Sequence, residues 1–142
     1  MTEQKNKLTG TWKLVSAVSK ALSGEYNETP YGTNPTGLLT YTEDGRVASV
    51  ISYGGRKPLP VTGGTIEHQA EAFKTCLAYA GSYTLNGDKV THRVEVSSIE
   101  NYVKRDLVRA VKFDGERIVL VTPPTSVNGK IQSIELTWQR LH

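Results

Sequence analysis

The sequence offers few of the residues that metal, redox or disulfide chemistry requires. There is one cysteine, Cys76, so no intrachain disulfide can form. The three histidines, His68, His92 and His142, lie far apart in the sequence and lack the spacing of known zinc motifs. Phosphate-binding and dinucleotide-binding loops and the Gly-x-Ser-x-Gly element of serine hydrolases are also absent. We therefore expect neither a metal nor another cofactor.

Long apolar runs and clusters of one charge are missing as well. No stretch approaches the roughly 20 apolar residues that span a bilayer, and residues 1–7 lack the apolar run of a signal peptide. The net charge of +3 arises from 17 basic and 14 acidic residues spread along the whole chain. Nucleic-acid binding would need a basic patch. We expect a cytoplasmic protein that binds neither membranes nor nucleic acid.

Length and composition fit a single folded domain over residues 1–142. The chain is 37% hydrophobic and 22% charged, which is apolar enough for a core. Thirteen glycines and six prolines favour many turns over long helices. No change in composition divides the chain, and it contains no internal repeat.

Four turn dipeptides dominate the pattern: Asp44-Gly45, Asn86-Gly87, Asp114-Gly115 and Asn128-Gly129. Each lies between apolar-rich runs, and such pairs are favoured in type I′ hairpins because both central residues need a positive φ. The runs predict eight strands, at about 11–19, 37–42, 46–52, 78–85, 89–98, 106–113, 117–122 and 131–141. Eight up-and-down antiparallel strands can close into a barrel that holds one small ligand. A β-sandwich is the alternative all-β fold.

One segment, residues 65–77, has helical rather than strand periodicity. Ile66, Ala70, Phe73 and Leu77 recur at helical spacing, and Thr65 is suited to an N-cap. We expect a short helix across or beside the barrel mouth, with Cys76 as a small packing residue within it. The segments 20–36 and 53–64 are expected to be loops.

Hairpin register indicates which side chains face inward. A two-residue turn at Asn86-Gly87 places His92 opposite Gly81, between two tyrosines. The apolar face of this hairpin contains Tyr79, Gly81, Tyr83, Val90, His92, Val94 and Val96. The Asp114-Gly115 turn likewise directs Arg109 inward, where an unpaired charge is costly. For the strands at 37–42 and 46–52 the inward face is undecided: either Leu39 and Tyr41, or Leu38 and Thr40, point inside.

Several runs resemble the bacterial and fungal lipocalin-like domain family, a calycin-type barrel. They are Gly10-Thr11-Trp12, 31–42, 44–46, 78–84, 87–92 and Val94-Glu95, so the resemblance covers nearly the whole chain. It implies a central cavity, with Trp12 plugging the closed end and Arg140 lying across it. Residues 99–102 depart from the Pro-Asn-Trp-like run of many relatives, so ligand preference does not carry over.

The polar residues expected inside the barrel allow three interpretations. The first is a small, mostly apolar ligand bound in the cavity by Tyr41, Tyr79, Tyr83, His92 and Arg109. In the second, a cofactor-independent isomerase, cyclase or dehydratase uses His92, Tyr79 and Tyr83 for proton transfer on a small carbonyl compound. The resemblance allows this, since some lipocalin-like proteins of secondary metabolism act as cyclases or isomerases. The third is a hydrogen-bonded network that only stabilises the barrel. Ligand identity, enzymatic activity and homodimer formation through Val108 and Ala110 stay open.

Overall fold

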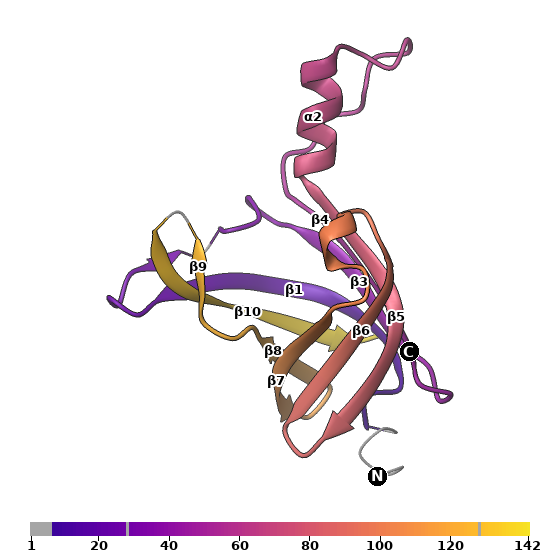
Figure 1. The fold of residues 1–142 in the computed structure, drawn as a ribbon, viewed down its shortest axis with the longest axis vertical. Coiled ribbons are helices and arrows are strands. Elements are labelled where there is room, and N and C mark those ends of the chain that lie inside the picture. The colour runs from indigo at the N-terminus through magenta and orange to yellow at the C-terminus, as the bar shows by residue number, and fades with distance from the viewer. Residues whose placement is uncertain (1–6, 28, 128) are drawn as a thin grey trace.

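The computed structural model is a closed antiparallel β-barrel (Figure 1), described here for residues 7–27, 29–127 and 129–142. Its helical elements include the α-helix α2 (Ile66–Lys74) and the 3-10 helix η1 (Glu100–Tyr102). Its strands are β1 (Gly10–Ala21), β2 (Tyr26–Asn27), β3 (Thr36–Tyr41), β4 (Arg46–Ser52), β5 (Cys76–Asn86), β6 (Lys89–Ser97), β7 (Asp106–Asp114), β8 (Arg117–Val121), β9 (Thr125–Val127) and β10 (Lys130–Arg140).

Eight of these strands close the barrel, in the order β1-β3-β4-β5-β6-β7-β8-β10, and β10 pairs again with β1. All of these pairings are antiparallel. The predicted eight-stranded barrel is thereby confirmed, and the β-sandwich is excluded. The short strands β2 and β9 lie outside this ring, against β1 and β10, in segments where no strand was expected.

The hairpin turns differ from the prediction by one residue. Asn86 pairs with Lys89, so Gly87 is the first residue of the two-residue loop rather than the second; the Asp114 turn has the same offset. Gly87 and Gly115 have φ of 60°, whereas neither Asn86 nor Asp114 has a positive φ. The type I′ prediction is therefore wrong: glycine at the first position is typical of type II′ turns. Asn128, of the fourth predicted turn, lies outside the described residues.

This offset changes each cross-strand partner by two residues. Side chains between the turn and the irregularity at Gly81 therefore keep their predicted faces. His92 is 1% exposed and opposes Tyr83, not Gly81 as predicted. Val96 is the exception, at 62% exposed. The register shifts between Ala80 and Gly81, and the extra residue on β6 reverses the facing of the residues after it, which is the effect of a β-bulge.

The undecided hairpin is resolved in favour of Leu39 and Tyr41. Both are 1% exposed, while Leu38 is 52% exposed on the outer surface. Inside the barrel, Leu39 and Tyr41 join an apolar core built from every strand of the ring. That core consists of Leu8, Trp12, Leu14, Ala17, Leu39, Tyr41, Val47, Ile51, Tyr83, Leu85, Val90, Val111, Ile118, Leu120, Leu136 and Trp138.

One end of the barrel is sealed by Trp12 and Arg140, as the resemblance implied. The Arg140 guanidinium carbon lies 4.2 Å from the centre of the Trp12 ring. Its two terminal nitrogens donate to the carbonyls of Thr9 at 2.7 Å and Lys7 at 2.6 Å. Trp12 Nε1 donates to the Leu8 carbonyl at 2.9 Å. These contacts fix the segment before β1 under the barrel, so access to the interior is from the opposite end.

Helix α2 begins after Thr65, whose side chain accepts from the backbone N–H of His68 at 3.2 Å. The predicted N-cap is therefore confirmed. The helix ends at Lys74, three residues earlier than expected, so Cys76 belongs to β5 and not to the helix. It projects away from the barrel beyond β4 and β5 (Figure 1) and buries none of its residues. No helix in the described part of the chain is long and apolar enough to cross a membrane.

Candidate functional site

Two neighbouring cavities occupy the open half of the barrel. The deeper one, the inner chamber, has a volume of about 40 Å³. It is lined by Tyr31, Leu39, Ser49, Ile51, Leu77, Tyr79, His92, Arg109, Leu120, Thr122, Leu136 and Trp138. The outer one, the mouth, measures about 380 Å³ and is lined by Tyr31, Leu77, Tyr79, Tyr102, Arg105, Asp106, Leu107, Val108, Arg109, Thr122, Pro123, Thr125, Gln132 and Ile134. Tyr79 and Arg109 line both, so they stand where mouth and chamber meet.

His92 is the central polar residue of the inner chamber. Its Nδ1 lies 2.6 Å from the hydroxyl of Tyr79, and its Nε2 lies 2.7 Å from the hydroxyl of Tyr41. The three residues come from β6, β5 and β3, so the contact with Tyr41 spans the barrel interior. Both ring nitrogens are thus engaged, and the imidazole is held between two phenols.

Burial controls the ionisation of this cluster. Loss of water, with a smaller effect of the Arg109 guanidinium, lowers the pKa of His92 to about 3. Burial likewise raises the pKa of Tyr79, and that of Tyr41 rises well above its ordinary value. At neutral pH the histidine and both phenols are therefore uncharged, and His92 has one N–H.

Arg109 brings a positive charge into the barrel from β7. Its inward direction, predicted from the hairpin register, is confirmed by its place in the walls of both cavities. Its Nη1 donates to the Val108 carbonyl at 3.1 Å. Among the described residues it forms no ion pair with an Asp or Glu. No carboxylate of the described residues therefore pairs with this charge where the two cavities meet.

Tyr83, predicted beside His92 as a catalytic and binding residue, points elsewhere. Its hydroxyl donates to the Thr42 carbonyl at 3.0 Å, in the turn between β3 and β4. Its ring packs edge-on against Tyr41, with the ring centres 4.7 Å apart. It is not among the residues that line either cavity. Tyr83 therefore supports Tyr41 from the closed side.

The sequence reasoning missed Trp138 and Tyr31. Trp138 is 1% exposed and lines the inner chamber, and its Nε1 has no hydrogen-bond partner among the described residues. Tyr31 comes from the segment before β3 and stacks on Tyr53, with ring centres 4.8 Å apart. The inward alternation of β10 could have identified Trp138, whereas no strand pattern applies to Tyr31.

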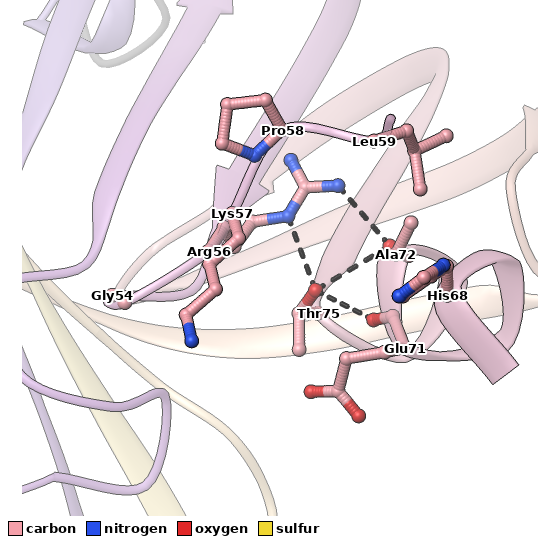
Figure 2. Close-up of a pocket in the computed structure, with 10 residues that line it drawn as sticks. Gly54, Arg56, Lys57, Pro58, Leu59, His68, Glu71, Ala72 and Thr75 are labelled. Carbon is pink, nitrogen blue, oxygen red and sulfur yellow. Dashed lines mark hydrogen bonds between the residues drawn. The ribbon is translucent and has the colours of Figure 1, made fainter. Parts of the chain in front are cut away.

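A third pocket, of about 320 Å³, lies outside the barrel between α2 and the loop 54–59 (Figure 2). Arg56 dominates it: its Nε donates to Thr75 Oγ1 at 3.1 Å and its Nη2 to the Ala72 carbonyl at 3.2 Å. These bonds satisfy groups at the C-terminal end of the helix. The pocket thus contains a clamp that attaches α2 to the loop. Its lining includes His68 and Glu71, but no cluster of three metal-ligating side chains occurs in the described residues.

The sequence profile of the lipocalin-like domain family matches residues 9–141. The chain belongs to this family. A relative from Aspergillus oryzae, named 4'-hydroxy-3'-methoxypropiophenone carrier protein ppsC, is 33% identical over 87 residues, or 55% of this chain and 78% of that protein.

Two solved structures are similar over most of the chain. A lipocalin-like protein from Bacteroides uniformis has a TM-score of 0.48 and 13% identity, covering 94% of this chain and 98% of its own. The lipoprotein YedD from Klebsiella pneumoniae has a TM-score of 0.41 and 11% identity, covering 95% and 72%.

Proposed function

We propose that this lipocalin-like protein reversibly binds a small, mostly apolar organic molecule in the open half of its barrel. The main support is the mouth of about 380 Å³, which lies in the size range of small-molecule sites. Its wall combines aliphatic side chains, among them Leu77 and Ile134, with three tyrosine rings and several charged and polar groups. The name of the Aspergillus relative, a carrier of an aromatic ketone, agrees with this role.

Binding explains the polar cluster better than proton-transfer catalysis does. A general acid or base works best with a pKa near the working pH, but burial lowers the pKa of His92 to about 3. Both of its nitrogens already contact tyrosines, at 2.6 and 2.7 Å. A substrate would have to displace one of these phenols to exchange a proton with the ring. The alternative of a cofactor-independent isomerase or cyclase therefore requires a rearrangement of the cluster.

The proposal can be tested with N-phenyl-1-naphthylamine, an uncharged probe whose fluorescence rises in apolar surroundings. We expect saturable binding of one probe per chain. Leu77→Trp should abolish it, because Leu77 lines both cavities and an indole there fills the passage between them.

Val50→Trp is the matched control. Val50 is 48% exposed on the outer face of β4, so the same indole is added outside the barrel. This variant should bind the probe as the wild type does. Unchanged binding by Leu77→Trp, or an equal loss in both variants with the fold intact by circular dichroism, would contradict binding inside the barrel.

A further inference from the structure

The Tyr41–His92–Tyr79 cluster has one more hydrogen on oxygen or nitrogen than it has hydrogen bonds between its members. Two phenols and a neutral imidazole have three hydrogens on oxygen or nitrogen, and the cluster contains two hydrogen bonds. One phenol must donate to the unprotonated ring nitrogen, while the other accepts from the ring N–H. The accepting phenol keeps an O–H that needs an acceptor elsewhere.

Burial decides which tyrosine keeps that O–H. Tyr41 is 1% exposed and lines neither cavity, and His92 is the only hydrogen-bond partner of its hydroxyl in the described part of the chain. A hydrogen left there would be a buried donor without an acceptor, which is unfavourable. Tyr79 lines both cavities. The favoured chain therefore runs from the Tyr41 hydroxyl to Nε2, from Nδ1–H to the Tyr79 oxygen, and from the Tyr79 O–H into the cavity.

Two other groups around this point are donors only, whereas the Ser49 and Thr122 hydroxyls of the chamber can donate or accept. Arg109 is a guanidinium without an acidic partner among the described residues, and Trp138 adds an indole N–H without a hydrogen-bond partner there. The charged residues of the mouth are Arg105, Arg109 and Asp106, and the Asp106 carboxylate is paired with Arg93 at 3.1 Å. In the described part of the chain, the walls of the two cavities thus contain no carboxylate that is free to pair with Arg109.

We propose that the site selects a ligand with an oxygen anion of the phenolate or enolate type, with Tyr79 as hydrogen-bond donor and Arg109 as counter-charge. This inference rests on the proposed binding function and specifies its ligand class. The chamber of about 40 Å³ has room for an oxygen and little more, so the flat apolar body lies in the mouth. Charge-assisted hydrogen bonds of this kind are about twice as strong as neutral ones.

The test compares 4-nitrophenol with 4-nitroanisole, which has a similar shape but cannot ionise. Visible absorption distinguishes bound nitrophenolate from nitrophenol. We expect the wild type to bind 4-nitrophenol as the phenolate, about ten- to a hundredfold more tightly than 4-nitroanisole. Tyr79→Phe and Arg109→Met should each reduce this preference while 4-nitroanisole binding is retained.

Tyr26→Phe is the matched control, because Tyr26 is exposed on β2 and lines neither cavity; its preference should equal that of the wild type. Equal affinity for the two probes, or a preference that survives both substitutions, would overturn the inference. N-phenyl-1-naphthylamine is measured on the same samples. If it binds while the preference is absent, only the ligand class is wrong; if it does not bind inside the barrel, the proposed function itself fails.

A second measurement leaves the cluster intact. Replacing the exposed His68 and His142 with Gln leaves His92 as the only histidine of the chain. Nitrogen-15 chemical shifts then report which ring nitrogen has the proton. We expect it on Nδ1, with Nε2 as acceptor. A proton on Nε2 would instead leave the spare O–H on Tyr41 and overturn the assignment of Tyr79 as the donor.

Discussion

The depressed pKa of His92 predicts that acid destabilises the fold through this one residue. The pKa is about 3 in the folded chain, against an ordinary value of 6.5. Between these values the unfolded chain takes up a proton that the folded chain does not. The contribution of His92 to stability is therefore fully present above pH 6.5 and is lost as the pH falls towards 3.

The loss amounts to about 1.4 kcal/mol per pH unit in this window. Lowering the pH from 7.5 to 4.5 should thus remove about 2.7 kcal/mol, a large share of the 5–15 kcal/mol typical of whole domains. Surface carboxylates also titrate in this range, so the effect of His92 has to be isolated by comparison. His92→Gln removes the ionisation, and His68→Gln is the matched control, since His68 is exposed on α2.

The assay is urea unfolding followed by tryptophan fluorescence, at several pH values from 7.5 to 4.5. Wild type and His68→Gln should lose stability in parallel. His92→Gln should be the less stable protein at pH 7.5, because an amide fits the two phenols less well, but its curve should fall less steeply and approach the others by about 2.7 kcal/mol at pH 4.5. Parallel curves for all three proteins would refute the argument that burial keeps His92 neutral.

Two further predictions concern the frame of the barrel. Gly81→Ala should destabilise by about 3 kcal/mol or more, because a Cβ at Gly81 would lie 1.8 Å from the Arg93 carbonyl oxygen; Ser82→Ala, on the opposite face, is the control, and equal melting temperatures for the two would contradict the bulge geometry. Arg140→Leu should cost about 2–4 kcal/mol in urea unfolding through the lost Trp12 stacking and two carbonyl bonds. Arg117→Leu, on the surface nearby, should stay within about 1 kcal/mol of wild type, and a similar small loss for Arg140→Leu would mean that the seal is not needed.

The barrel was predictable because its information is local. Each turn is encoded by a glycine next to Asp or Asn, and alternation then assigns a face to every residue of the flanking strands. The predicted turns differ from the observed ones by one residue. This difference moves each cross-strand partner by two residues, so every side chain stays on the same face of its strand. The alternation of β5 and β6 does not predict the bulge, although a glycine inside a strand, such as Gly81, often marks one. Because of this bulge, the Val96 side chain points outward, although the inward–outward alternation along β6 predicts that it points inward.

The site was predictable only in part, because its decisive contacts join strands that are not neighbours. Hairpin register placed His92, Tyr79 and Arg109 inside the barrel, and all three line the inner chamber. The same register put Tyr83 beside them, but its hydroxyl reaches the Thr42 carbonyl instead. The contact between Tyr41 and His92 spans the interior from β3 to β6 and exists only once the ring is closed. No local pattern contains that information.

The pairing of β1 with β10 has a consequence for how the chain reaches its fold. It joins Trp12 to Arg140 and Ala21 to Gln132, so the closing contacts link residues more than a hundred positions apart. Contacts this distant in sequence slow folding, because a long loop must be ordered before they form. On the ribosome, strands β1 and β8 have exposed edges until the segment through Arg140 has been synthesised, and unpaired edges are prone to aggregation. Pairing of β10 with β1 and β8 thus ends the period in which these two edges are exposed.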